Sequence, residues 1–218
     1  MSTPGVKTYD RIVEESLALF NQQGERNITT NHIAAHLGIS PGNLYYHFRN
    51  KEEIISQIFL QYRAFFAERF TMINEQALTL EDLANYLDTA FEAMWRFRFM
   101  FYDLPNLLAR DPKLQADYHS FVDNELADIL NRMFRGLVQF GLLKMGDDDI
   151  APLITNIWLV AKYWFSFLQS AKPDTPVTEA DSRRGTHQVL MLLKPYVQPN
   201  FQAQFAGLIS RATTGVSK

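Results

Sequence analysis

The sequence predicts an all-α fold, with a small N-terminal three-helix unit followed by a long helix and a larger helical bundle. Apolar residues recur at three- and four-residue spacing along most of the chain, which is the period of an amphipathic helix. No stretch alternates apolar and polar residues as a half-buried strand does, and no Asn-Gly hairpin signal is present. Capping residues such as Ser40-Pro41 stand where helices would begin.

The composition is that of a folded globular protein. The 218 residues are 47% hydrophobic and 21% charged, far from the polar composition of disordered chains. The absence of cysteine excludes disulfides, thiolate metal sites and cysteine nucleophiles. The first ten residues have no apolar core of the kind a signal peptide needs, and every apolar run is broken within a few residues. We therefore expect a soluble, cytoplasmic protein with no membrane association.

The first two helices are predicted from apolar periodicity that ends at glycine. Residues 6–23 carry one apolar stripe at helical spacing, and Gly24 supplies the stop. Residues 27–30 form an N-cap signal, and residues 30–37 form the second helix. Gly38 stands where the residue after a helix often needs a left-handed conformation, which glycine adopts at little cost.

A short third helix begins at Ser40-Pro41, because serine caps a helix N-terminus and proline is preorganised for the first helical position. Asn50 followed by Lys51 and two acids marks the end of this helix and the start of a fourth. The fourth helix is long, over residues 51–75. Its many apolar residues give it one apolar face for each of the two domains that it connects.

The rest of the chain reads as a bundle. Further helices are expected over 80–101, 112–140, 147–169, 179–193 and 199–211. Loops are expected over 104–111, 141–146 and 171–178, where Pro173 and Pro176 act as breakers. We therefore divide the chain into a first domain (1–50), a connecting helix (51–75) and a C-terminal domain (76–218).

Charge is distributed unevenly near the N-terminus. The net charge is −3, yet no acidic residue lies between Glu25 and Glu52. That window holds three cations and three histidines: Arg26, Arg49, Lys51, His32, His36 and His47. An acid-free window in an acidic protein is where a phosphate backbone would be tolerated.

Residues 30–48 have the arrangement of a helix-turn-helix: a helix, a short turn with glycine, and a second short helix that would enter the major groove. Six residues are expected to pack inward: Ile33, Ala34, Leu37, Ile39, Leu44 and Phe48. This leaves Asn43, Tyr45, Tyr46 and His47 facing outward or along the edge. Asparagine can read base edges, and tyrosine and histidine can donate hydrogen bonds to phosphates.

Residues 28–55, ITTNHIAAHLGISPGNLYYHFRNKEEII, closely resemble the signature of the TetR (tetracycline-repressor) family. With the first helix, the resemblance covers about residues 6–60. It implies an all-helical homodimer, a DNA-binding domain in 1–50 and a ligand-binding and dimerisation domain in 76–218. It also implies a repressor that leaves a pseudo-palindromic DNA operator when a small molecule binds. The DNA contacts that it implies are Thr29, Thr30, Asn31, Ser40, Gly42, Asn43, Tyr45, Tyr46, His47 and Lys51.

The C-terminal domain offers candidate effector contacts. Residues 91–103 are unusually aromatic, and a pocket lined by Trp95, Phe99 and Tyr102 would suit an apolar or aromatic ligand, with core packing as the alternative for each ring. Arg96 and Arg98 need partners, either nearby acids (Asp103, Asp111 or Glu125) or the carboxylate of a bound ligand. The candidate set for an apolar or acidic effector is Trp95, Arg98, Phe99, Tyr102, His119, Asn156 and Tyr163.

The helices over 147–169 and 179–193 carry more apolar surface than one core-facing stripe uses, so we expect each to pair with its symmetry mate in a homodimer. Three consecutive acids, Asp147 to Asp149, fit a helix cap, and no calcium-loop spacing follows them. We expect no metal and no cofactor.

The sequence disfavours two other classes of protein. An enzyme is disfavoured because the chain has no phosphate-binding glycine loop, no Gly-x-Ser-x-Gly elbow and no His-Glu-x-x-His motif. A helical adaptor that no longer binds DNA is disfavoured by four intact residues of the motif: Thr30, Tyr45, His47 and Lys51. The sequence therefore predicts a DNA-binding regulator without enzymatic activity.

Overall fold

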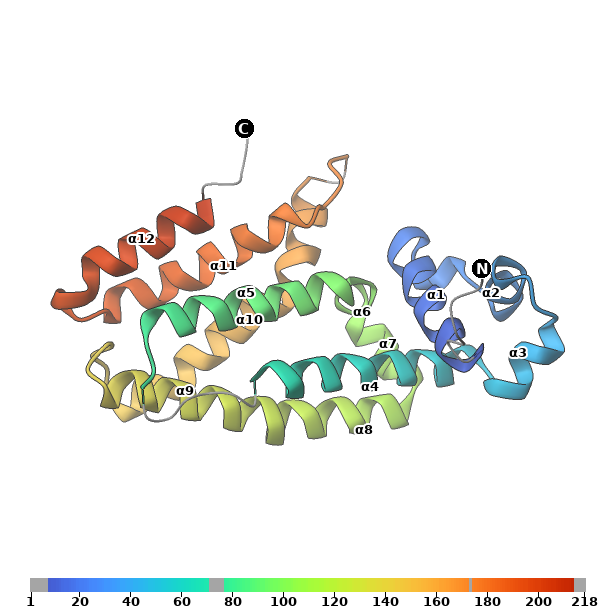
Figure 1. Cartoon of the computed structure of the whole chain (residues 1–218), viewed down its shortest axis with the longest axis horizontal. Helices are drawn as coiled ribbons and strands as arrows, with labels where there is room; N and C mark the ends of the chain where they lie inside the picture. Colours follow the sequence, from blue (N-terminus) through green and yellow to red (C-terminus); the bar gives the residue numbers. More distant parts are fainter. Residues whose placement is uncertain (1–7, 71–76, 173, 214–218) are drawn as a thin grey trace, which may run out of the picture. The chain divides into compact units, whose positions relative to one another are not determined.

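The structure, a computed structural model, describes residues 8–70, 77–172 and 174–213, and nearly all of its regular structure is helical (Figure 1). Over these residues the one β interaction is an isolated antiparallel bridge between Leu143 and Val197. The all-α prediction is confirmed. None of the described helices is both long and apolar enough to cross a membrane.

The chain divides into two compact units. Unit 1 combines the chain up to Phe65 with Phe97–Ala116, and unit 2 combines Phe66–Arg96 with the chain from Asp117 onward. Neither predicted boundary, at residue 50 or at residue 75, coincides with this division. Part of the predicted C-terminal domain belongs to unit 1, because residues that follow Phe97 pack with the N-terminal helices.

Unit 1 is built from short helices around the start of a long one. It holds α1 (Thr8–Gln23), the 3-10 turn η1 (Glu25–Asn27), α2 (Thr30–Leu37), α3 (Pro41–His47), the first part of α4 (Lys51–Phe70), α6 (Arg98–Tyr102), α7 (Leu104–Arg110) and the start of α8 (Pro112–Ser120).

Unit 2 is a bundle of longer helices. It holds the ends of α4 and α8, together with α5 (Leu80–Arg96), the π-helical turn η2 (Phe121–Leu126), α9 (Ala127–Gln139), α10 (Asp147–Ala171), α11 (Ala180–Leu193), the 3-10 turns η3 (Lys194–Tyr196) and η4 (Pro199–Phe201), and α12 (Gln202–Thr213). In this unit α11 packs against α5, α10 and α12 (Figure 1).

The core of unit 1 joins the N-terminal helices to α6. Ile12 and Phe20 of α1, Ile33 of α2 and Leu44 of α3 are fully buried. The ring of Phe99 in α6 lies 5.1 Å from that of Phe20. The backbone N–H of Phe99 donates to the side-chain oxygen of Asn21, at 3.1 Å. These contacts explain why α6 belongs to unit 1.

Two predicted elements are wrong. The helix expected over 80–101 breaks at Phe97, whose fully buried ring packs edge-on against Tyr62, 5.5 Å between centroids. The loop expected over 104–111 is helix α7, which buries Leu104 and Leu107 and holds its proline in the first turn, where no N–H is needed. The helix expected over 112–140 is confirmed, because α8, η2 and α9 follow one another without a break over residues 112–139, with η2 as a π-helical segment inside it.

The other predicted elements are confirmed to within one or two residues where they are described. Gly38 has φ 67° and ψ 29°, the left-handed conformation expected after the second helix. The expected start of the first helix at residue 6 and the expected end of the fourth at residue 75 lie outside the described residues. The last helix begins as a 3-10 turn at Pro199 and continues as α12.

In unit 2 the contact between α5 and α11 is very close. The ring of Phe91 in α5 is 1% exposed and lies against Gly185 of α11, where a Cβ would come within 2.2 Å of the ring. The side chain of Thr186 donates to a carboxylate oxygen of Asp88 at 2.8 Å in the same contact. Glycine is therefore required here by packing.

Candidate nucleic-acid interface

The start of α2 is held by a capping box in which a histidine replaces the usual acid or amide. The hydroxyl oxygen of Thr29 accepts the backbone N–H of His32 at 3.3 Å, and the ring Nδ1 of His32 accepts the backbone N–H of Thr29 at 3.3 Å. Thr30 is half-buried, and Asn31 is exposed on the same first turn. Unpaired N–H groups and a positive dipole end make this turn suitable for a phosphate.

The start of α3 is fixed by Ser40. Its hydroxyl oxygen accepts the backbone N–H of Asn43 at 3.1 Å, and Pro41 follows at the first helical position. The predicted cap and proline position are confirmed. Gly42 and Asn43 are exposed on the same turn.

Two tyrosines project from α3. Tyr46 is 85% exposed and Tyr45 is 49% exposed, whereas the preceding residue, Leu44, is buried. The hydroxyl of Tyr45 lies 3.1 Å from that of Thr30, within hydrogen-bonding distance. This link fixes the tyrosine hydroxyl beside the first turn of α2, so one phosphate could contact both side chains.

His47 is held at the edge of α3 by aromatic neighbours. Its ring centroid lies 5.1 Å from that of Tyr46 and 6.3 Å from that of Tyr9 in α1, both in edge-on geometry. Tyr9 also stacks on Phe48 at 4.6 Å. Burial raises the pKa of Tyr9 above its ordinary value, with added effects of Asp10 and Glu53, so its hydroxyl stays neutral near neutral pH.

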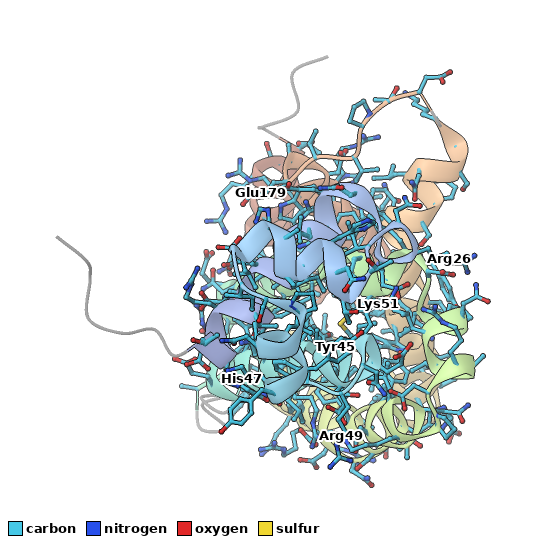
Figure 2. The ribbon with its side chains drawn as sticks, turned by 90° about the vertical axis from the view of Figure 1, so that its right-hand side faces the viewer. Arg26, Tyr45, His47, Arg49, Lys51 and Glu179 are labelled. Atoms are coloured by element: carbon cyan, nitrogen blue, oxygen red, sulfur yellow. The ribbon has the colours of Figure 1, made fainter. Side chains whose placement is uncertain are left out.

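Lys51 is used within the protein. Its Nζ lies 3.0 Å from the carbonyl oxygens of Glu25 and Ile28 and 2.7 Å from a carboxylate oxygen of Glu25. Figure 2 labels Lys51 together with Tyr45, His47 and Arg49 in unit 1. The phosphate contact expected of Lys51 would require this ammonium to leave these acceptors.

The charges of the acid-poor window are partly neutralised from elsewhere in unit 1. Arg26 pairs with Asp103 at 2.6 Å, and Arg110 of α7 pairs with the buried Glu25 at 2.9 Å. Arg49 is exposed, and its guanidinium has no partner among the residues that the structure describes. The predicted contact set lacks Arg49, although this arginine follows directly after the third helix.

The seven predicted effector contacts are divided between the two units. Arg98, Phe99 and Tyr102 belong to unit 1, and the remaining four belong to unit 2. Phe99 is part of the core of unit 1, and Trp95 packs on Phe165, with 5.7 Å between ring centroids. The other residues of the set in unit 2 (His119, Asn156 and Tyr163) are exposed.

Arg98 is partly buried, and this burial lowers the pKa of its guanidinium. Asp103, one of its expected partners, pairs with Arg26 instead. Four cavities can be described: one of about 540 Å³ beside His47, and three in unit 2 of about 580, 300 and 360 Å³. None of the seven predicted effector contacts lines any of these four.

Two family models match the chain. Residues 12–58 match the model described as "Bacterial regulatory proteins, tetR family", and residues 61–205 match the model described as "Bacterial transcriptional repressor". The chain belongs to the TetR family. The first match spans α1, α2, α3 and the start of α4, which are the elements that carry the capped turns and the exposed tyrosines.

Other known proteins are similar over most of the chain. A TetR-family transcriptional regulator from Marinobacter aquaeolei VT8 is 41% identical, with a TM-score of 0.87 over 95% of this chain and 99% of that chain. The Transposon Tn10 TetC protein of Escherichia coli is 25% identical over 70% of this chain and 77% of its own length. The structure of KstR2 of Mycobacterium tuberculosis, 22% identical with a TM-score of 0.61 over 89% of this chain and 97% of its own, shares the fold.

The resemblance to the TetR family and the expected function as a transcriptional regulator are thus confirmed. The individual DNA and effector contacts stay predictions.

Proposed function

We propose that this TetR-family regulator is a homodimeric repressor that binds a pseudo-palindromic DNA operator and releases it when a small-molecule effector binds. The observation that carries the proposal is the exposed polar surface formed by the first turns of α2 and α3, where the Thr30–Tyr45 hydrogen bond links the two helices. We assign the chain no catalytic activity. It would act in the cytoplasm, where a bacterial operator lies.

The proposed contacts divide by chemistry. Hydroxyl and amide groups at the start of α2 would bind the DNA backbone, and α3 would enter the major groove, where Asn43 reads a base edge. Tyr46, the most exposed large side chain of α3, is free to lie against a base or a thymine methyl group. The proposed set is Thr29, Thr30, Asn31, Ser40, Gly42, Asn43, Tyr45, Tyr46 and His47.

A second copy of the chain is the proposed partner of α10 and α11. Leu159, Tyr163 and Phe167 are 50%, 42% and 58% exposed and repeat every four residues, so they lie on one face of α10. Met191 of α11, which packs beside α10, is 40% exposed. Two such helix pairs related by a twofold axis would bury this apolar stripe in a four-helix interface.

The effector is proposed to be an apolar or acidic small molecule. α4 begins in unit 1 and ends in unit 2, so one helix runs from the DNA-binding elements into the bundle. A shift of α4 on effector binding would change the separation of the two α3 helices in the dimer, which must match successive major grooves about 34 Å apart. If a saturating, confirmed effector left the operator affinity unchanged, this coupling would be excluded.

DNA binding is tested first with the duplex that flanks the protein's own coding region, alongside a randomised duplex pool. We expect saturable, sequence-dependent binding by the wild type, a loss of at least tenfold in affinity for Tyr45→Ala, and a smaller loss for Tyr45→Phe, which lacks the hydroxyl next to Thr30. If the wild type binds neither the flanking duplex nor any sequence in the pool, the chain would instead be a helical adaptor or an enzyme.

The dimer is tested by sedimentation. The double substitution Leu159→Glu/Phe167→Glu should give a folded monomer, because four carboxylates would otherwise be buried between the two copies. Leu60→Glu, at a residue of α4 that is 39% exposed, is the matched control and should stay dimeric. A dimer that survives the double substitution would place the interface elsewhere.

A further inference from the structure

The ammonium of Lys51 is held by three acceptor oxygens within the protein. It donates hydrogen bonds to the carbonyl oxygens of Glu25 and Ile28 at 3.0 Å each, and it forms an ion pair with a carboxylate oxygen of Glu25 at 2.7 Å. Its side chain is only 18% exposed. All three acceptors lie in the segment between α1 and α2.

Glu25, the partner of Lys51, would be left as a buried carboxylate with one cation fewer if Lys51 moved to DNA. The side chain of Glu25 is 5% exposed, and its second carboxylate oxygen pairs with Arg110 at 2.9 Å. Removing Lys51 would leave this buried carboxylate with one cation, and taking a partner from a buried charge is strongly unfavourable. The network therefore opposes a turn of Lys51 toward solvent.

Arg49 has the opposite properties. Its backbone is fixed, since its N–H donates to a carboxylate oxygen of Glu53 at 2.8 Å, and the N–H of Glu53 donates to the side chain of Asn50 at 2.8 Å. Its side chain is exposed and unpaired within the part of the chain that is described. A fixed backbone with a free guanidinium suits a phosphate, which arginine can bind with two N–H groups.

Arg49 is also in the right place. It follows Phe48, the residue that ends α3. Figure 2 shows Tyr45, His47 and Arg49 on the side of unit 1 that faces the viewer. The other arginine of the acid-poor window, Arg26, is already paired with Asp103.

From these contacts we infer that Arg49 is the cation that binds the DNA backbone beside α3, and that Lys51 is a positioning residue that ties the start of α4 to the segment before α2. The inference rests on the proposed DNA binding and changes the role expected of the lysine in the family signature. It gives each subunit few phosphate-binding cations, so the operator affinity depends on two subunits binding together.

The slope of the logarithm of the binding constant against the logarithm of salt concentration separates the two roles, because it counts the phosphates that are neutralised. The probe is a duplex selected by the wild-type protein from a randomised pool. Arg49→Ala should lower the magnitude of the slope by roughly 2 for a dimer, at about 0.9 per contact. Arg49→Lys should keep the wild-type slope, and so should Arg135→Ala, at an exposed arginine of α9.

Lys51→Met, which keeps the aliphatic part of the side chain, should keep the wild-type slope while lowering the melting temperature. If Lys51→Met does not fold, the slope of Arg49→Ala decides, because Arg49 is exposed and its removal leaves the fold intact. An unchanged slope for Arg49→Ala, or a reduced slope for Lys51→Met, overturns the inference. Absence of wild-type binding to any selected duplex would instead refute the proposed function.

Discussion

Replacing Gly42 with alanine should stabilise the protein and weaken DNA binding. Gly42 is exposed on the first turn of α3 and is not among the glycines with positive φ. A Cβ built there meets only the hydroxyl oxygen of Ser40, at 3.9 Å, which is an ordinary contact. The fold therefore has no need of a glycine at this position, and glycine in a helix costs about 0.5–1 kcal/mol relative to alanine.

The protein should become more stable, and its affinity for DNA should fall. The free energy of unfolding should rise by about 0.5–1 kcal/mol, which raises the melting temperature by about 1–4 °C in a protein of this size. The added methyl group would occupy space that the DNA needs for close approach to the start of α3. We expect the operator affinity to fall at least tenfold, which corresponds to about 1.4 kcal/mol.

Thermal unfolding and a fluorescence-anisotropy titration with the selected duplex measure the two effects. Gly207→Ala is the matched control, since Gly207 in α12 has no atom within 4 Å of its Cβ position and no positive φ. It should give the same stabilisation with unchanged DNA affinity. If Gly42→Ala binds DNA like the wild type, the start of α3 does not approach DNA closely, and the proposed orientation of this helix is wrong.

Three further substitutions probe the interior. Gly185→Ala should lower the free energy of unfolding by about 1–3 kcal/mol in urea denaturation, because its Cβ would lie 2.2 Å from the buried Phe91 ring; wild-type stability would contradict this close packing. Ser16→Ala should raise the free energy of unfolding by about 1 kcal/mol, since this fully buried hydroxyl has no hydrogen-bond partner among the described residues; a loss of stability would show that the hydroxyl is paired. Burial raises the pKa of Tyr118 far above its ordinary value of 10.0, with a smaller effect of Tyr163. The neutral tyrosine therefore stabilises the folded state fully below pH 10, and this stabilisation is lost as the pH rises toward the folded-state pKa. Tyr118→Phe should therefore lose less stability than the wild type between about pH 10 and 12 in denaturant titrations, and parallel stability curves would rule this out.

The DNA-binding elements could be predicted because their signals are local. The cap of α3 depends on Ser40 and Asn43, three residues apart, and the turn before it depends on the left-handed conformation of Gly38. Hydrogen bonds of this kind form between residues three or four apart, whatever the rest of the chain does. Helical spacing of apolar residues likewise indicated the fold class and most helix positions.

Some helices were decided by packing that no local pattern contains. The break at Phe97 follows from burial of its ring against Tyr62, and α7 forms where a loop was expected. Tertiary packing overrides the helix propensity of a segment when it buries an aromatic side chain. For the same reason the segment from Phe97 to Ala116 belongs to unit 1 rather than to the bundle.

The pairing of the charges was also decided by tertiary structure alone. By charge alone, Arg26, Arg49 and Lys51 are three similar cations in one acid-free window, and the family resemblance singled out Lys51. Asp103 and Arg110, which lie 77 and 85 residues from their partners, neutralise Arg26 and complete the network of Glu25 and Lys51. The sequence by itself determined that a helix-turn-helix forms and which of its residues cap each helix. The folded chain decided which of these cations has no ion-pair partner among the described residues, because ion pairing depends on which side chains the packing brings together.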